Sequence, residues 1–118
     1  MNFYKSSDLN CRCKQGLACT AEPMKLPFLR KFNALAKEWG KPLHITSGAR
    51  CKLHNFKIGG AEHSQHLLSN AVDLNFQDAA ESLEFSALAE KFGFNGIGLG
   101  VRLVHIDDRE KVARWNYF

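Results

Sequence analysis

Between residues 26 and 39, apolar residues recur at steps of three and four, which is the spacing of one face of an α-helix. This apolar stripe consists of Leu26, Leu29, Phe32, Leu35, Ala36 and Trp39. Pro27 is compatible with the first turn of a helix, whereas Gly40 and Pro42 favour its end. The pattern therefore predicts an amphipathic helix over residues 26–39.

Residues 70–76 alternate with a period of two, which is typical of a half-buried strand. One face carries Val72, Leu74 and Phe76, and the other carries Ala71, Asp73 and Asn75. A shorter alternation predicts a strand over residues 43–46, and a hairpin is predicted over residues 97–101 and 103–107. In the last strand, Val104 and Ile106 share one face, and the other face carries Leu103, His105 and Asp107.

The remaining segments complete an α+β pattern. A second helix is expected over residues 78–92, with a buried side made of Leu83, Ala87, Leu88 and Phe92. Residues 1–22 show no period, residues 48–69 form a long loop of the kind that carries function, and the aromatic tail 113–118 is expected to pack down. Short connections between the late strands predict a small antiparallel sheet with helices packed on one side. We expect residues 1–118 to form a single domain.

The composition is that of a folded protein. Of the 118 residues, 45% are hydrophobic and 24% are charged, which argues against disorder. The net charge of +4 comes from scattered Lys and Arg residues, so we expect no nucleic-acid binding, although a mildly positive field suits an anionic polymer such as a bacterial wall. No run reaches the ~18 apolar residues of a membrane helix, and no signal peptide is visible. We therefore expect no membrane contact.

The redox state of the cysteines stays open. They are Cys11, Cys13, Cys19 and Cys51. Cys11 and Cys13 are too close in sequence to pair readily with each other, whereas bridges that include Cys51 are compatible with the sequence. A four-thiolate zinc site usually has two Cys-x-x-Cys pairs, which this chain lacks. The spacing favours reduced thiols or a single disulfide over a structural zinc ion.

Two histidines and an aspartate occupy positions that can meet. Asp73 and His105 lie on the polar faces of two predicted strands, and His66 precedes the first of these strands by a short turn. Imidazole nitrogen and carboxylate oxygen are ligands of catalytic zinc, which keeps its fourth position open for water. Asp107, on the same face as His105, is within reach as an acid/base group. A lone histidine is more often an ordinary surface or core residue, so the spacing alone leaves that alternative open.

One segment resembles the Ser-x-His-x-x-Gly-x-Ala-x-Asp motif of zinc D-alanyl-D-alanine peptidases, which share their fold with the signalling domain of hedgehog proteins: Ser64-Gln65-His66-Leu67-Leu68-Ser69-Asn70-Ala71-Val72-Asp73. Three further segments are similar to small bacterial and phage members of that family. They are Ile45-Thr46-Ser47-Gly48-Ala49-Arg50, then His54-Asn55 followed by Gly59-Gly60, and Val104-His105-Ile106-Asp107. The resemblance covers roughly residues 25–115 in the right order.

The resemblance implies a hedgehog/DD-peptidase-like fold. The Zn2+ ligands that it implies are His66, Asp73 and His105. Arg50 would lie at the substrate's carboxylate, where a guanidinium can donate two parallel hydrogen bonds, although a solvated loop charge is a common alternative. Ser64 would donate a hydrogen bond near the site or serve only as a turn residue, and Trp115 would form an apolar wall or pack in the core. His63 is a spare imidazole beside the motif, either for substrate or without a role.

Two positions depart from the family pattern. Ser69 stands where the motif has Gly; if that Gly serves a positive φ, Ser69 is less suited to it and Asn70 is the alternative. Many relatives place an acid three residues before the last histidine, where this chain has Arg102. We expect Asp107 to replace that acid as the acid/base group, with orientation of His105 as its alternative role.

The residues themselves predict metal-assisted hydrolysis of an amide bond. The resemblance implies that the enzyme is zinc-dependent and cuts peptide bonds in peptidoglycan stem peptides, as a D-Ala-D-Ala carboxypeptidase or an endopeptidase. A non-catalytic, zinc-containing cell-wall-binding domain is the alternative, because Arg102 cannot act as a base. A nucleic-acid module fits less well, since no aromatic residues are interleaved with a basic stripe. We expect a monomer whose partner is a peptidoglycan peptide. Synthesis in the cytoplasm with action at the cell wall would suit a phage lysis enzyme or a domain of a larger assembly.

Overall fold

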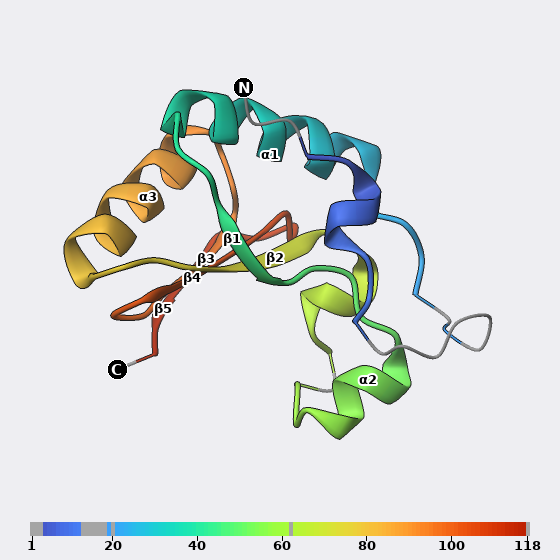
Figure 1. The fold of residues 1–118 in the computed structure, drawn as a ribbon. Coiled ribbons are helices and arrows are strands. Elements are labelled where there is room, and N and C mark those ends of the chain that lie inside the picture. The colour runs from blue at the N-terminus through green and yellow to red at the C-terminus, as the bar shows by residue number, and fades with distance from the viewer. Residues whose placement is uncertain (1–3, 13–18, 20, 62, 118) are drawn as a thin grey trace.

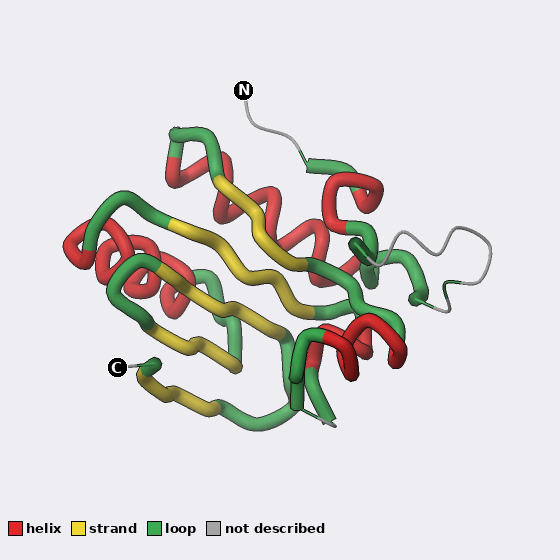
Figure 2. Tube along the Cα trace, turned by 60° about the horizontal axis from the view of Figure 1, so that its bottom comes forward, coloured by secondary structure: helices red, strands yellow, loops and turns green. Residues whose placement is uncertain are grey.

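The sheet of this protein has five strands in the order β1-β2-β4-β3-β5 (Figure 2). The computed structural model describes residues 4–12, 19, 21–61 and 63–117. The strands are β1 (His44–Ser47), β2 (Ala71–Asn75), β3 (Gly96–Leu99), β4 (Leu103–Asp107) and β5 (Ala113–Asn116). Neighbouring strands are antiparallel except for β3 and β5, which are parallel. The fold is α+β as the sequence predicts, with a parallel pair at one edge that the prediction of an antiparallel sheet did not include.

Two long helices cover one face of this sheet (Figure 1). They are α1 (Leu26–Trp39) and α3 (Ala79–Lys91). Helix α1 ends at Gly40, which has a left-handed φ of 73° and donates its amide hydrogen to the carbonyl of Ala36. Helix α3 begins after Asp78, whose carboxylate accepts a hydrogen bond from the amide of Glu81. None of the helices in the described ranges is long and apolar enough to cross a bilayer.

Short helical segments occupy the stretches where the sequence shows no clear period. The predicted loop 48–69 contains α2 (Lys52–Lys57) and the 3-10 turn η3 (Gln65–Leu68), and α2 lies away from α1 and α3 in Figure 1. A further 3-10 turn, η1 (Ser6–Leu9), ends at a fully buried leucine. The carbonyl of Leu9 accepts a hydrogen bond of 2.8 Å from the amide of Ala49, so the N-terminal segment docks on the stretch that follows β1.

The core lies between the two long helices and the sheet. Its largest members are Phe28, Phe32, Leu35, Val72, Leu74, Phe85, Phe94, Val104 and Ile106. The predicted faces of β2 and β4 are confirmed, because their apolar residues point into this core. Since side chains alternate along a strand, the polar residues of both strands project from the opposite face.

The predicted buried face of the second helix is confirmed only in part, because Leu88 and Phe92 pack against the core whereas Leu83 and Ala87 do not. Leu83 is 59% exposed and Ala87 is also exposed, whereas the buried residues of α3 are Ser82, Phe85 and Ala89. The apolar residues of this helix are spread around its circumference, so their period does not select one side. Phe85 decides the orientation, because its ring packs against Trp39 at 5.2 Å and Phe76 at 4.9 Å between ring centroids.

Replacing these two apolar residues of α3 tests which face supports the fold. Phe85→Ala should lower the free energy of unfolding by about 3–5 kcal/mol, because it removes a buried ring and leaves a cavity. Leu83→Ala, on the exposed side of the same helix, should change it by only about 0.5 kcal/mol. Urea unfolding followed by circular dichroism measures both values. A larger loss in the Leu83 variant would contradict the orientation of α3.

Candidate metal centre

The pairing of β2 with β4 places a carboxylate opposite an imidazole. Asp73 is the direct cross-strand partner of His105, and both side chains project from the face that α1 and α3 leave uncovered. Oδ1 of Asp73 lies 2.8 Å from Nδ1 of His105. Both residues are largely buried, with side chains 17% and 7% exposed, so this contact is sheltered from bulk water.

The second imidazole comes from η3. His66 is 2% exposed, and its Nε2 atom lies 3.1 Å from Oδ2 of Asp73. The turn is capped at its start by Ser64, whose Oγ accepts a hydrogen bond from the amide of His66. It ends at Ser69, which itself adopts the left-handed conformation, with a φ of 55°. Asn70, the alternative carrier of a positive φ, does not adopt it.

Ser69 tolerates this conformation because hydrogen bonds hold it. Its Oγ donates to the carbonyl of Glu22 at 2.6 Å, and its own carbonyl accepts from the amide of Lys25 at 2.9 Å. These contacts offset the steric cost of a side chain in the left-handed region. A serine thus stands where the motif has glycine and itself adopts the left-handed conformation that ends the turn.

His66, Asp73 and His105 form a group in which each residue offers a ligand atom, and these atoms all lie within 4.8 Å of one another. The other ring nitrogen of each histidine is already occupied. Nδ1 of His66 lies 2.7 Å from the carbonyl oxygen of Gly48, and Nε2 of His105 lies 2.6 Å from Oδ2 of Asp107. Since carbonyl and carboxylate oxygens accept, these nitrogens carry hydrogen and the opposite nitrogens face Asp73.

The donor set fits a zinc ion. Nε2 of His66 is buried and has no partner of acceptable hydrogen-bond geometry in the part of the chain that the structure describes, which an ion would provide. Burial lowers the pKa of His105, but hydrogen bonds to Asp107 and Asp73 raise it more, so the net pKa lies above its ordinary value. A metal ion would take the place of the proton on Nδ1. Two imidazoles and one carboxylate match the ligands of catalytic zinc.

Asp107 lies behind His105 and has no exposed surface. Its carboxylate accepts hydrogen bonds from the backbone amide, Nε and Nη2 of Arg109, at 3.0, 2.9 and 2.6 Å. Burial raises the pKa of Asp107, but the bonds from Arg109 and His105 outweigh that effect and hold it below its usual range. This geometry favours the orienting role and argues against the acid/base role that we expected from the sequence, because water and substrate do not reach the carboxylate.

Two glycines of β3 make room for this arrangement. In the pairing of β3 with β4, Gly96 lies opposite Asp107 and Gly98 lies opposite His105. A Cβ atom at Gly96 would overlap the carboxylate of Asp107, and a Cβ atom at Gly98 would overlap the indole of Trp115. Gly98 in the predicted strand 97–101, two residues after Gly96, is the signal that sequence reasoning missed, since a strand glycine often marks a close approach.

Trp115 reaches over Gly98 to form one wall of the site. It belongs to β5, lies opposite Gly98, and its ring centroid is 5.2 Å from that of His105. On the other side, the guanidinium of Arg109 lies 4.7 Å from the Trp115 ring centroid, a cation–π contact. Of the two roles considered for Trp115, an apolar wall of the site and a core residue, this position favours the apolar wall. Arg109 itself was not singled out in the sequence.

Arg50 is held at the edge of the site by three hydrogen bonds. It donates to Ser47 Oγ, Asn55 Oδ1 and Asp73 Oδ2, at distances between 3.1 and 3.2 Å. A guanidinium has five N–H groups, so two remain for a substrate.

Burial raises the pKa of Asp73, but contacts with His105 and His66 lower it more, so the net pKa lies below its usual range. The ionised carboxylate therefore persists at neutral pH.

A pocket opens in front of the metal-binding group. Its lining includes the three proposed ligands, and around them stand Arg50, His63, Ser64, Arg109, Trp115 and Tyr117. Burial is the main cause that raises the pKa of Tyr117, so its phenol keeps its proton at neutral pH. Among the described residues of this lining, Asp73 is the only carboxylate.

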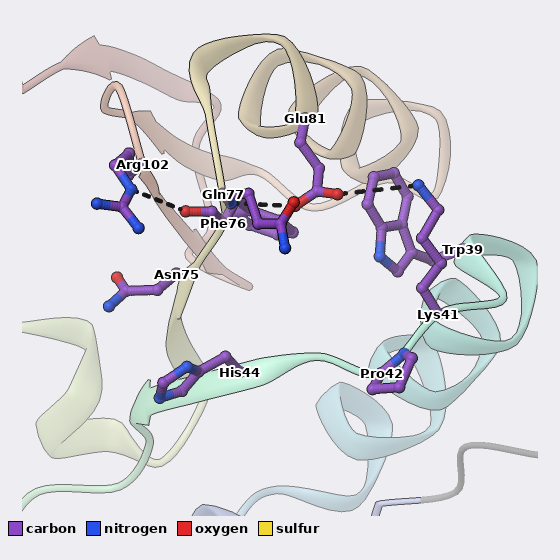
Figure 3. Close-up of a pocket in the computed structure, with 9 residues that line it drawn as sticks. All are labelled: Trp39, Lys41, Pro42, His44, Asn75, Phe76, Gln77, Glu81 and Arg102. Carbon is purple, nitrogen blue, oxygen red and sulfur yellow. Dashed lines mark hydrogen bonds and ion pairs between the residues drawn. The ribbon is translucent and has the colours of Figure 1, made fainter.

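Arg102 lies outside this pocket. It lines a different hollow with Trp39, His44 and Glu81, and its Nε donates to the carbonyl of Phe76 at 3.2 Å (Figure 3). The position where many relatives carry an acid is therefore turned away from the metal-binding group in this chain.

Two imidazoles and a carboxylate that face an open pocket have the composition of a catalytic metal centre of the metallohydrolase class. The model of the Peptidase M15 family matches residues 2–107, so the chain belongs to that family. The match includes the three proposed ligands and Asp107, and it ends before Trp115 and Tyr117. A search of curated proteins found no match.

The role of Asp107 can be tested by removing its charge. Asp107→Asn should weaken zinc binding by about 10–100-fold, because such a partner orients the ligating imidazole and raises its basicity. Competition with a chromogenic chelator measures the affinity. Asp108→Asn is the matched control, since Asp108 pairs with Lys31 at 2.6 Å instead of with a histidine. Unchanged zinc affinity with lost hydrolysis would restore the acid/base role of Asp107.

Proposed function

We propose that this protein is a zinc-dependent peptidase that hydrolyses peptide bonds in peptidoglycan stem peptides. The observation that carries the proposal is the convergence of His66, Asp73 and His105, with the second nitrogen of each imidazole occupied by a hydrogen bond. Membership of the Peptidase M15 family supports the peptidase class. The wall substrate follows from the resemblance of residues 64–73 to the motif of D-alanyl-D-alanine peptidases.

Bound zinc would supply Lewis acidity that activates water and polarises the scissile carbonyl. The protein's own residues prepare the site for that ion. Gly48 and Asp107 keep the imidazoles in the tautomers that leave one nitrogen available. Arg50 forms an ion pair with Asp73, whose carboxylate also contacts both histidines. Trp115 covers His105 and limits the access of bulk water from that side.

Hydrolysis also needs a group that takes a proton from water and delivers it to the leaving amine. Among the described residues of the pocket that are not proposed ligands, His63 carries the side-chain type that most often does both in enzymes. It is exposed, it directly precedes Ser64 in the sequence, and it lines the same pocket as the proposed ligands. Tyr117 keeps its proton and is suited to donate a hydrogen bond to a developing oxyanion.

Two guanidinium groups in the pocket favour an anionic substrate. Arg50 retains two N–H donors, and Arg109 lies beside Trp115 on the other side. A peptide that ends in a carboxylate next to the scissile bond would satisfy this charge. We therefore favour the D-Ala-D-Ala carboxypeptidase activity over internal cleavage, and we place the activity at the cell wall.

The alternative is a zinc-containing domain that binds wall peptide without cutting it. The observation that favours this alternative is the lack of a second described carboxylate in the pocket, with Asp107 buried and Arg102 turned away. It differs from the main proposal in one measurable respect, since it retains zinc and peptide binding but releases no product.

The test is release of D-alanine from a stem pentapeptide that ends in D-Ala-D-Ala, followed by mass spectrometry. The zinc-loaded protein should release it, and both a chelator and His66→Ala should abolish release. His63→Ala should lower kcat by about 100–10,000-fold while the zinc content stays the same.

His44→Ala is the matched control, because His44 is exposed and lines the hollow around Arg102. Zinc loading and peptide binding without product from either this peptide or cross-linked wall fragments would refute the peptidase proposal in favour of the binding domain.

Amidation of the substrate's terminal carboxylate tests the role of Arg50. In the wild type, amidation should lower kcat/KM by about 10–100-fold, which is the effect of one or two charge-assisted hydrogen bonds. In Arg50→Lys, which keeps the charge but loses the planar fork, the free acid and the amide should differ much less. Zinc content serves as the control, because Arg50 also contacts Asp73. An equal loss on amidation in both proteins would place the carboxylate elsewhere.

A further inference from the structure

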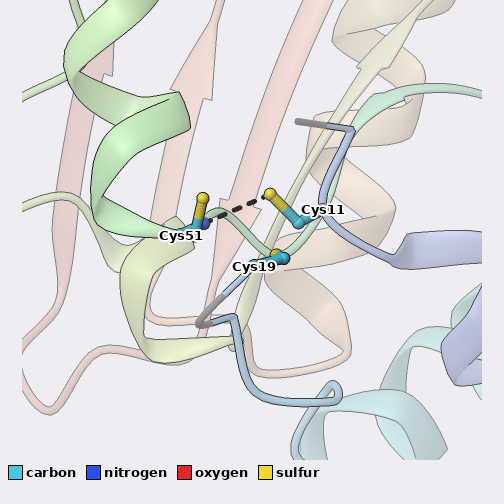
Figure 4. Close-up of side chains that lie close together, drawn as sticks. All are labelled: Cys11, Cys19 and Cys51. Carbon is cyan, nitrogen blue, oxygen red and sulfur yellow. Dashed lines mark hydrogen bonds between the residues drawn. The ribbon is translucent and has the colours of Figure 1, made fainter. Parts of the chain in front are cut away.

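Two cysteines of the N-terminal segment and one that follows β1 lie close together (Figure 4), and none of them is among the residues that line the pocket. They are Cys11, Cys19 and Cys51, and their sulfur atoms all lie within 4.8 Å of one another. We propose that these three side chains bind a soft divalent metal ion, zinc in the first instance, at a site separate from His66, Asp73 and His105. The proposal is independent of the peptidase activity.

The distances suit a metal better than the sequence spacing suggests. Zinc–sulfur bonds of ~2.3 Å in a tetrahedron place two sulfur atoms about 3.8 Å apart. Sulfur atoms within 4.8 Å of one another are therefore about an ångström from that arrangement. The fold achieves this although the chain has no pair of Cys-x-x-Cys motifs, because it brings the N-terminal segment against the residues that follow β1.

Backbone amides already point at two of the sulfur atoms. The amide of Cys51 donates to Sγ of Cys11 at 3.2 Å, and the amide of His54 donates to Sγ of Cys51 at 3.4 Å. Such donors stabilise negative charge on sulfur, which is the form that binds metal. Arg12 and Lys52, which directly follow Cys11 and Cys51 in the sequence, add positive charge nearby.

A disulfide is the competing arrangement, and it differs in the number of sulfur atoms that it uses. It would join two of the three cysteines and oxidise them, whereas a metal ion would engage all three and release their protons to solvent. The convergence of three sulfur atoms therefore favours the metal. A water molecule or a further side chain would complete the tetrahedron; Cys13 lies outside the described residues.

The position of this site gives it a structural role. Cys51 follows Arg50, which contacts Asp73, and Cys11 follows Leu9, whose carbonyl binds the amide of Ala49. An ion shared by Cys11 and Cys51 would fasten the N-terminal segment to the stretch that supports the other metal centre. That stretch begins at Gly48, where a Cβ atom would overlap the carbonyl of Leu9.

The experiment uses the full chain, purified with reductant and loaded with cobalt(II) in place of zinc. Thiolate ligands give cobalt an intense charge-transfer absorption in the near ultraviolet, and imidazole and carboxylate ligands do not. The wild type should show this band, His66→Ala should keep it, and Cys19→Ser should lose it. Metal analysis should show that each variant loses one of the two ions of the wild type.

A second measurement needs no variant and so does not depend on how well a variant folds. In the zinc-loaded wild type, a thiol reagent should modify the cysteines slowly, and a chelator should speed the modification. A wild type without the thiolate–cobalt band would overturn the proposal. A disulfide between two of these cysteines in the protein purified without reductant would also overturn it. Intact mass spectrometry would detect that bond as a mass lower by two hydrogens. Neither outcome bears on the peptidase proposal, which His66→Ala tests separately.

Discussion

The register between β2 and β4 is the constraint on which the rest of the structure depends. It places Asp73 directly opposite His105 on the face away from the core. The same row continues through Gly98 in β3 to Trp115 in β5. Two proposed ligands, a glycine that leaves space and the indole wall therefore follow one another across four strands. A slip of one residue would turn Asp73 into the core and expose Leu74, which makes the register costly to change.

Burial of charge explains how the surroundings of this row are organised. Asp73 and Asp107 lie in sheltered positions, where an unpaired carboxylate would be strongly unfavourable. Arg50 compensates the first and Arg109 the second, and His105 lies between them. One nitrogen of each imidazole is held by a hydrogen bond to the protein, and the other nitrogen is directed toward Asp73. A divalent cation there would complete the balance of charge and donors.

The apolar pattern was sufficient to predict α1, β2, β4 and the faces of both strands, because a core on one side of a sheet imposes strict alternation. It predicted the helix α3 but only part of its buried face, because apolar residues surround that helix and Phe85 instead of Leu83 enters the core. It also missed α2, η3 and β5, which are short and held by tertiary contacts. β5 is parallel to β3, a pairing that needs a chain crossing no local pattern reveals.

For the site, the motif at residues 64–73 indicated His66 and Asp73 as ligands and the segment 104–107 indicated His105, and the structure brings these three side chains together. The acid/base role expected for Asp107 depended on its face alone, and the face could not reveal Arg109 behind it or the complete burial of the carboxylate. The cysteines show the converse. Their spacing argued against a metal, whereas the contact between Leu9 and Ala49 brings three of them together through space. In both cases, contacts between residues distant in the sequence supply information that the local pattern lacks.

The most direct test of the account is a crystal structure of the zinc-loaded protein with anomalous diffraction data at the zinc edge. The account predicts a peak about 2.0–2.2 Å from Nε2 of His66, an oxygen of Asp73 and Nδ1 of His105, with one coordination position open to the pocket. The absence of a peak there at saturating zinc, or a peak bound through other atoms of these residues, would contradict it.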